Sequence, residues 1–345
     1  MKIAVHGASG FTGRLTVAEV RRRGFTPVLV GRDAGRLRKA AAEAGAQDAE
    51  LRVAGLDEPG ALADALRDCA AVVNCAGPFT LLGTPVIRAA LAAGVHYLDT
   101  TGEQGYLKRV LEEFGLAAER AGVSVVPAMA DDGGLGDLIA HLTAERAGPE
   151  VADLLIADLR RPGAVSRGTA RSMASVFAEG ALEYAGGAWR PAVPGDAGTM
   201  AVPGEDGETP VTAFALPGVV TIPRHVRAGR VRSAIRADVA ALFGALTADV
   251  VDSVPEVPDP AARLAARWLM LAEATAPDGR RARGWVSGLD AYGMTAVIAV
   301  EGARRLVADG ARPGVLTPAQ AFDPAAFLSH LAAAHDVTWQ VTQEP

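Results

Sequence analysis

A glycine triad near the start of the chain constrains the fold most strongly. Gly7, Gly10 and Gly13 occupy positions 1, 4 and 7 of the segment GASGFTG, between an apolar strand predicted over residues 2–6 and a helix predicted over 11–24. In this context the glycines permit a tight turn and a close approach of the backbone to a pyrophosphate, which the helix N-terminus attracts. No Gly-Lys-Ser/Thr closes the segment, so it is not a Walker A loop. The predicted dinucleotide-binding turn comprises Gly7, Ser9, Gly10, Phe11, Thr12 and Gly13.

Strand and helix patterns alternate through the first third of the chain. Short apolar runs predict six strands, at residues 2–6, 28–30, 51–56, 71–75, 95–98 and 123–126, with helices at 11–24, 34–45, from 59, 85–93 and 104–122. Alternation of this kind favours parallel pairing with right-handed crossovers. We therefore expect an α/β fold with a doubly wound parallel Rossmann sheet, whose ligands bind at the carboxyl ends of the strands.

The pattern changes after residue 137 and predicts an inserted α+β domain. Strands are expected at 151–160 and 283–289, helices at 169–179, 260–274 and 292–309, and strands joined by turns over the Gly- and Pro-rich stretch 186–218. A helix at 318–334 is expected to pack on the first domain. The predicted domains are an NADP-binding Rossmann domain (1–137), an α+β substrate and dimerisation domain (138–312), and a C-terminal segment returning to the Rossmann domain (313–345).

Composition excludes several classes of protein. A net charge of −6 and a pI near 5.6 argue against a nucleic-acid-binding surface. No apolar run approaches the roughly 18–20 residues that span a bilayer, and the start lacks the apolar core of a signal peptide. Cys69 and Cys75 form no disulfide framework or zinc motif, and the six histidines show no metal-ligand spacing. We expect a soluble, cytoplasmic protein without a metal, a membrane or a nucleic-acid partner.

The tip of the second strand bears on the choice of cofactor. An acidic residue there binds the ribose 2′-hydroxyl of NAD, whereas an arginine accommodates the 2′-phosphate of NADP. Gly31 and Arg32 occupy this tip, and Asp33 fits the N-cap of the next helix. NADP(H) is therefore the predicted cofactor, with Arg32 at its 2′-phosphate and Asp57 after strand three as a further contact. The alternative for Arg32 is a solvated, basic helix face.

Two further strand ends are predicted to approach the nicotinamide. Ala76, Gly77 and Pro78 follow strand four, where small residues suit a backbone close to the ribose, although an ordinary turn is the alternative. Strand five ends in the polar segment 97–103. There Thr100 or Thr101 also suits the N-cap of the next helix, with Glu103 in its first turn.

These motifs together resemble the saccharopine dehydrogenase-like oxidoreductases, which include the trans-acting enoyl reductases. The resemblance rests on GASGFTGR, VGRDAGRL, NCAGPF, HYLDTTGE and VVPA, and extends to segments near 166, 290 and 314. It implies an NADP-type Rossmann domain, an inserted α+β domain and reduction of a C=N or C=C bond. Many relatives have a Gly-Phe-Asp-Ser-x-Pro-Ser-like segment after strand six, whereas this chain has Met-Ala-Asp-Asp-Gly-Gly at 129–134. Asp131 keeps the aspartate's place and is included among the predicted cofactor contacts.

The absence of several motifs narrows the range of possible catalytic mechanisms. No tyrosine is followed four residues later by lysine, no Gly-x-Ser-x-Gly occurs, and residues 109–345 contain no lysine. The predicted function is an NADPH-dependent reductase that transfers a hydride to a C=N or activated C=C bond of a small metabolite. The alternatives are a non-catalytic NADP(H)-binding sensor or scaffold, and a carbonyl reductase. Tyr97 and Asp99 are the predicted catalytic residues, because strand five ends beside the nicotinamide in this topology. The other candidate proton donors are Glu103, Asp131, Tyr292 and His225.

One basic segment leaves two interpretations open. Residues 224–236 contain five arginines and one histidine, which suits either a solvated or interface surface or recognition of an anionic substrate by the bidentate guanidinium group. We also expect a homodimer formed through the sheet of the inserted domain, because that domain is small and rich in turns.

Overall fold

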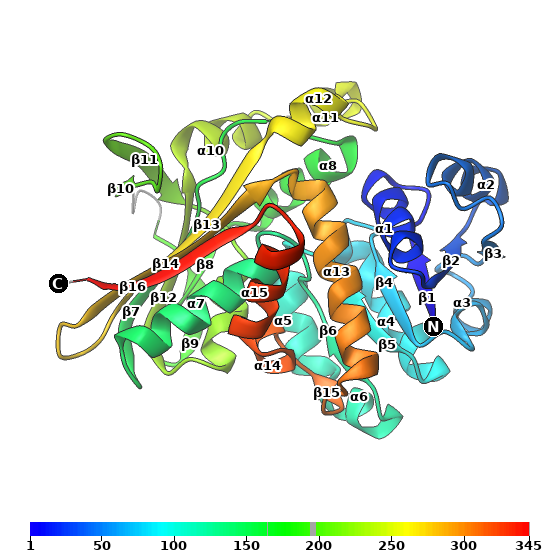
Figure 1. Ribbon diagram of the computed structural model, residues 1–345, viewed down its shortest axis with the longest axis horizontal. Helices are drawn as coiled ribbons and strands as arrows, with labels where there is room; N and C mark the ends of the chain where they lie inside the picture. Colours follow the sequence, from blue (N-terminus) through cyan, green and yellow to red (C-terminus); the bar gives the residue numbers. More distant parts are fainter. Residues whose placement is uncertain (164, 194–197, 345) are drawn as a thin grey trace. The chain divides into compact units, whose positions relative to one another are not determined.

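The computed structural model describes residues 1–163, 165–193 and 198–344 (Figure 1). Contacts divide the chain into two compact units. The first contains Met1–Thr101, Gly105–Ala130 and Tyr292–Phe322. The second contains Gly102–Gln104, Asp131–Ala291 and the chain from Asp323 onward. Each unit has its own sheet.

The first unit is built on a parallel, seven-stranded sheet in the order β15-β6-β5-β4-β1-β2-β3. This order is the doubly wound arrangement that the alternation of strands and helices predicts, so the expected Rossmann sheet is confirmed. Among the strands of this sheet, only β15, which is two residues long, is not predicted from the sequence. The strands are β1 (Lys2–His6), β2 (Thr26–Gly31), β3 (Glu50–Val53), β4 (Ala71–Asn74), β5 (His96–Asp99), β6 (Ser124–Val126) and β15 (Gly314–Val315).

Helices connect and cover the strands of this sheet. One starts earlier than predicted, because Phe79 and not Pro85 begins α4, and the buried Phe79 ring packs against Tyr106 with ring centroids 5.8 Å apart. The helices are α1 (Phe11–Arg22), α2 (Ala34–Glu43), α3 (Pro59–Leu66), α4 (Phe79–Ala93), α5 (Gln104–Glu113), α6 (Gly115–Ala121), α13 (Ala291–Ala308) and α14 (Pro318–Ala321).

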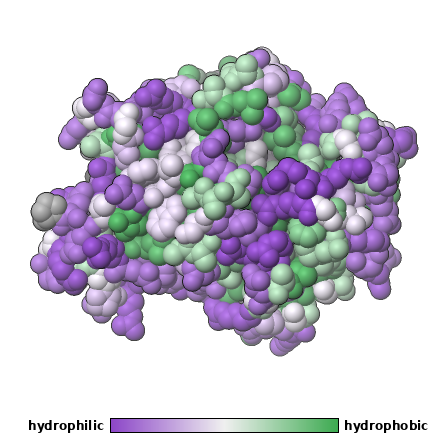
Figure 2. Space-filling view, viewed as in Figure 1, coloured by the Kyte–Doolittle hydropathy of each residue, from purple (hydrophilic) through white to green (hydrophobic). Residues whose placement is uncertain are grey.

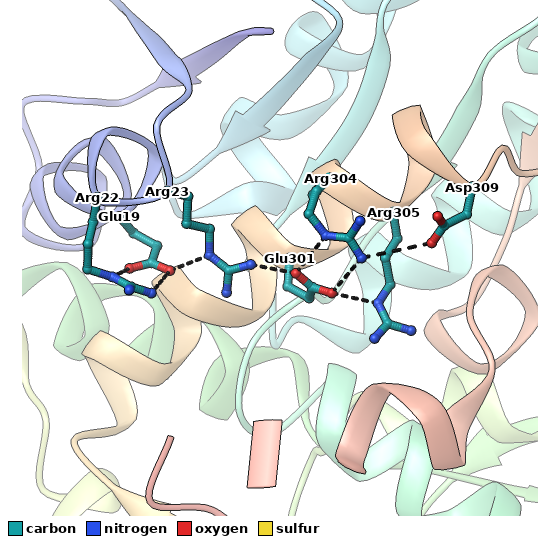
Figure 3. A network of polar contacts seen from close by, with 7 residues as sticks. All are labelled: Glu19, Arg22, Arg23, Glu301, Arg304, Arg305 and Asp309. Carbon is teal, nitrogen blue, oxygen red and sulfur yellow. Dashed lines mark hydrogen bonds and ion pairs between the residues drawn. The ribbon is translucent and has the colours of Figure 1, made fainter. Parts of the chain in front are cut away.

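An ion-pair network joins α1 to α13 within the first unit (Figure 3). Glu301 of α13 is completely buried and pairs with Arg23, the C-cap residue of α1, and, at 2.7 Å, with Arg305 of its own helix. Arg23 also pairs with the nearly buried Glu19 at 2.6 Å. Buried carboxylates of this kind depend on their cationic partners. The network therefore attaches a late helix to the helix that follows the glycine turn.

The second unit contains a mixed sheet, as the predicted α+β domain requires. Its main path is β10-β11-β12-β7-β13-β14-β16, in which only β12 and β7 pair in parallel, and β8 and β9 lie off this path. The strands are β7 (Val151–Asp158), β8 (Leu182–Ala185), β9 (Ala188–Pro191), β10 (Gly198–Ala201), β11 (Glu208–Ala213), β12 (Ala228–Arg236), β13 (Arg267–Thr275), β14 (Arg281–Leu289) and β16 (Thr338–Glu344).

Helix α7 packs on one face of this sheet, and its close approach requires a glycine in β14. A Cβ on Gly284 would overlap the Thr143 side chain and lie 3.4 Å from Ile139, both on α7. The helices of the unit are α7 (Gly134–Ala147), α8 (Arg167–Glu179), α9 (Gly218–Thr221), the 3₁₀ helix η1 (Ile222–Arg224), α10 (Ala237–Gly244), α11 (Ala248–Ser253), α12 (Pro260–Ala265) and α15 (Pro324–Ala334).

The prediction of a single helix over residues 260–274 is wrong. Helix α12 ends at Ala265, and residues 267–275 form β13. This strand pairs with β7 on one side and β14 on the other, and most of its side chains are buried whichever face they occupy. A strand buried on both faces shows a continuous apolar run, which periodicity alone does not distinguish from a buried helix.

The course of the C-terminal third also differs from the predicted domain limits. The chain re-enters the first unit at Tyr292, where α13 packs closely enough that a Cβ on Gly302 would lie 3.0 Å from Leu98. From Asp323 onward the chain belongs to the second unit, because β16 pairs with β14 and α15 packs on α7.

Hydrophobic side chains are also exposed on the short helices of the second unit. They include Leu242 on α10, Val250 on α11 and Leu264 on α12. In Figure 2 hydrophobic residues gather at the top of the view, where Figure 1 shows α11 and α12.

Candidate nucleotide-binding and active site

The glycine turn between β1 and α1 has the geometry that a pyrophosphate needs. Gly7 has φ +73°, and the Gly10 N–H donates to the Gly7 carbonyl at 2.9 Å. A Cβ on Gly7 would lie 2.9 Å from Ala76, and one on Gly13 would overlap the Gly7 carbonyl. Gly10 is the N-cap of α1 and brings no capping side chain, so the helix N-terminus is suited to an anion. The cradle fits a dinucleotide phosphate.

Beyond the glycine turn, the tip of β2 carries no acidic side chain directed to a ribose. Asp33 is the N-cap of α2 and accepts the Arg36 N–H at 2.9 Å, which lowers the pKa of the Asp33 carboxyl. The N-cap assignment is therefore confirmed. Arg32 is exposed directly after β2, and Asp57 is exposed in the loop after β3. Their predicted contacts with NADP(H) stay predictions.

The loop after β4 lies against the glycine turn. Ala76 is the residue that a Cβ on Gly7 would meet, and its N–H donates to the Asn74 side chain at 3.1 Å. Gly77 and Pro78 continue this loop to Phe79, where α4 begins. The structure thus brings the predicted contacts at 7 and 76–78 together at the carboxyl ends of β1 and β4.

A buried chain of hydrogen bonds runs across the carboxyl ends of β1, β4 and β5. His6 Nδ1 lies 2.8 Å from Asn74 Oδ1, and Asn74 Nδ2 donates to the Tyr97 hydroxyl at 3.1 Å. The hydroxyls of Tyr97 and Tyr106 both donate to Asp99 Oδ2 at 2.9 Å. Buried polar groups of this kind are costly unless paired, so the network fixes these strand ends relative to one another.

Asp99 also holds the turn that follows β6. Its Oδ1 accepts the backbone N–H groups of Thr101 and Ala128, at 3.1 and 2.9 Å, and Ala128 has the unusual φ of +61°. Burial raises the pKa of Asp99 to about 6. The hydrogen bonds from these two N–H groups and from the two tyrosine hydroxyls oppose the rise. Both Tyr97 and Asp99 are completely buried. Their contacts assign them a positioning role, and their predicted catalytic role stays a prediction.

Asp131 takes part in a carboxylate–arginine cluster of the second unit. Arg160 donates to Asp131 at 2.8 Å and to Asp158 at 2.6 Å. The neighbouring Asp132 is half-buried and accepts the Gly133 N–H at 2.8 Å. Burial and the charge of Asp131 raise the pKa of Asp132 to about 7, although Arg160 opposes this shift. One guanidinium facing three carboxylates thus leaves Asp132 holding a proton near neutral pH.

Three residues of the site are not predicted from the sequence: Asn74, Asp132 and Arg160. The sequence signal for Asp132 is its position beside Asp131 and before two glycines. In the folded chain, a Cβ on Gly102 would lie 3.1 Å from the Asp132 carboxylate. Arg160 lies 29 residues beyond Asp131, so only the folded chain relates them.

The remaining candidate proton donors are Glu103, Tyr292 and His225. Glu103 is buried, and the Tyr292 ring packs edge-on against Phe11 with centroids 5.1 Å apart. His225 hydrogen-bonds to Asp137 in the second unit at 2.8 Å. Four arginines of the basic segment are in ion pairs with acidic side chains, which favours its interpretation as a solvated or interface surface: Arg227, Arg230, Arg232 and Arg236.

Two kinds of feature do not occur among the described residues. No group of three or more His, Cys, Asp or Glu side chains among them has an arrangement that would hold a metal ion. None of the helices they form is long and apolar enough to cross a membrane.

The fold and the glycine cradle are those of a dinucleotide-binding domain. Residues 3–126 match the family model of the saccharopine dehydrogenase NADP-binding domain. The predicted resemblance is confirmed. The chain is 31% identical over 150 residues to a trans-acting enoyl reductase of Mycobacterium ulcerans, covering 42% of this chain and 36% of the relative.

Two other similarities extend this comparison. A saccharopine dehydrogenase-like oxidoreductase of Bos taurus is 27% identical over 140 residues, covering 36% of this chain and 33% of the relative. The chain matches between 33% and 44% of the length of these curated relatives. Saccharopine dehydrogenase (L-Glu forming) of Saccharomyces cerevisiae aligns over 100% of both chains with a TM-score of 0.67 at 13% identity, a likeness of fold alone.

Proposed function

We propose that the protein is an NADPH-dependent reductase of a small metabolite with a C=N or activated C=C bond. The observation that carries this proposal is the glycine cradle, in which a side chain at Gly7 or Gly13 would collide with the backbone or with Ala76. This cradle lies within the segment that matches an NADP-binding family. The names of the enoyl reductase relatives support a C=C acceptor. The resemblance of the sequence motifs to the saccharopine dehydrogenase-like oxidoreductases supports a C=N acceptor.

In this proposal the residues of the chain bind and orient the reactants and supply a proton. The bound dinucleotide supplies the hydride. The turn at 7–13 holds the pyrophosphate, and the exposed Arg32 binds the 2′-phosphate. The network at Asn74, Tyr97 and Asp99 keeps the strand ends beside this turn in place.

Asp132 is the proposed proton donor. Reduction of C=C leaves a carbanion-like centre, so an acid with a pKa near the working pH suits the reaction. Asp132 has this pKa, because burial and Asp131 favour its neutral form. It is also only half-buried, in contrast to Tyr97 and Asp99. For a C=N acceptor that arrives protonated, the ionised Asp132 instead stabilises the iminium group.

A substrate panel tests the proposed function. NADPH consumption would be followed with imines, enones and aldehydes, with NADPH affinity measured separately by titration. Turnover of an imine or enone is the expected result. Turnover of aldehydes alone identifies a carbonyl reductase. Tight NADPH binding without consumption across the panel supports the non-catalytic sensor or scaffold and contradicts the reductase.

A further inference from the structure

Two histidines of the second unit face each other through the same ring nitrogen. His141 lies on α7, and His225 follows η1 directly. Their Nδ1 atoms are 2.9 Å apart, and their ring centroids are 5.0 Å apart. The opposite nitrogen of each ring meets a carboxylate. His225 Nε2 lies 2.8 Å from Asp137, and His141 Nε2 lies 3.4 Å from Glu145.

The two carboxylates favour a particular arrangement of ring protons. The fully buried Asp137 carboxylate only accepts hydrogen bonds, so the His225 Nε2 that faces it carries a hydrogen, and the exposed Glu145 carboxylate favours a hydrogen on His141 Nε2 in the same way. A neutral imidazole has a single N–H, which would leave both Nδ1 atoms as bare acceptors. Two bare acceptors at 2.9 Å repel each other. A third ring proton between the Nδ1 atoms resolves the conflict, and it makes the pair one imidazole and one imidazolium.

Burial increases steadily along the four side chains. Side-chain exposure falls from 63% at Glu145 to 22% at His141, 6% at His225 and 0% at Asp137. The buried carboxylate of Asp137 balances the single positive charge of the pair. A second positive charge has no comparable partner, because Glu145 is largely in solvent. Burial, followed by the charge of His225, lowers the pKa of His141.

Other elements packed on α7 bring few charges to the pair. Helix α9 has no titratable side chain, η1 adds Arg224, and α15 adds His330. Gly284 of β14 faces α7, so alternation along the strands places Glu273, Arg281 and Arg283 on the opposite face of the sheet. Asp153 and Glu344 lie on that opposite face by their pairing registers. Asp158 pairs with Arg160. Asp137 and Glu145 therefore dominate the local field.

We propose that His141 and His225 share one proton at neutral pH and form a pH-sensitive latch between α7 and the segment after η1. A second proton, taken from solvent, binds the Nδ1 atom that accepts the shared hydrogen. Both Nδ1 atoms then carry hydrogens that point at each other, and the two imidazolium charges repel, so the contact opens. The latch does not depend on the proposed reductase activity.

Nuclear magnetic resonance of the full chain with ¹⁵N-labelled histidine tests the latch. Long-range ¹H–¹⁵N spectra at pH 7.5 should show three ring N–H groups for His141 and His225 together. On lowering the pH towards 5, a fourth should appear and the contact should be lost. His141→Gln should change the ¹⁵N signals of the His225 ring, and His330→Gln on α15 should change neither ring.

Three results would overturn the proposal. The first is two ring N–H groups at pH 7.5, one on each neutral imidazole. The second is a His225 ring whose ¹⁵N signals are unchanged by His141→Gln. The third is a pair that shows its third N–H only after dialysis against a chelator, which identifies a metal site instead.

Unfolding measurements provide a second readout. The wild type should lose stability as the pH falls below about 6.5, the ordinary pKa of histidine, and His141→Gln should lose less.

Discussion

Arg32 is the residue on which the choice of cofactor depends. It is exposed at the tip of β2, and the neighbouring Asp33 caps α2. A charge-assisted contact contributes about 1.5–3 kcal/mol, so Arg32→Ala should weaken NADPH binding roughly tenfold to a hundredfold. NADH binding should be unchanged, and so should NADPH binding by Arg67→Ala, an exposed arginine paired with Asp64. Equal affinity of the wild type for NADPH and NADH would contradict the assignment.

Asp132 determines the expected pH dependence of turnover. An acid that donates a proton must be protonated, and the pKa of Asp132 is about 7, so the rate should fall as the pH rises above 7. Asp132→Asn should lower the rate about 10²–10⁴-fold and remove this dependence. The control is Asp278→Asn, an exposed carboxylate paired with Arg280. A variant at position 132 with a full rate at pH 6 excludes Asp132 as the donor.

Tyr97 and Asp99 allow a test of structural against catalytic importance. Tyr97→Phe removes the partner of the Asn74 amide, and Asp99→Asn replaces acceptors of two backbone N–H groups and two hydroxyls. Each buried donor left unpaired costs about 1–3 kcal/mol. We therefore expect lower unfolding free energy by denaturant titration. Single-turnover rates per folded molecule should be retained, and their loss at unchanged NADPH affinity would support the catalytic assignment.

Among the elements, the contact between α1 and α13 has the clearest energetic consequence. Glu301 has no solvent exposure and faces Arg23, Arg304 and Arg305 (Figure 3). Removing one partner from a buried ion pair typically costs about 3–5 kcal/mol, so Glu301→Gln should destabilise the first unit by that order. Glu112→Gln on α5 breaks only an exposed pair with Lys108 and should cost at most about 1 kcal/mol. Equal losses in both variants would refute this account.

Elements with a local signal are the ones that the sequence predicts correctly. Gly7, Gly24 and Gly94 punctuate the alternation of strands and helices, and each has the positive φ that favours glycine. Strand β13 has no local signal because its apolar residues serve two buried faces. Strands β15 and β16 exist through partners distant in sequence, in β6 and β14. For the same reason, Arg160 cannot be assigned to the candidate site from the sequence. The glycine turn can be predicted, because all its residues are neighbours in the sequence.

At the scale of the whole molecule, we predict a homodimer formed through the sheet of the second unit. Light scattering at micromolar concentration should give twice the mass of the 35.4 kDa chain. The exposed hydrophobic side chains of α10–α12 offer another surface, since such patches often mark interactions. Leu242→Glu distinguishes a dimer formed through the sheet from one formed through α10–α12. A dimer formed through the sheet should survive this substitution, and a monomeric wild type would exclude both.

The order of synthesis gives the seventh strand of the first unit a particular importance. Strand β6 ends at Val126, but β15, which covers its edge, begins only at Gly314. A nascent chain must therefore carry an open strand edge until nearly all of the second unit has left the ribosome. Open edges template pairing with other chains, and slow, distant closure prolongs the exposure. The intermediate most prone to aggregate is thus a first unit that still lacks its last strand.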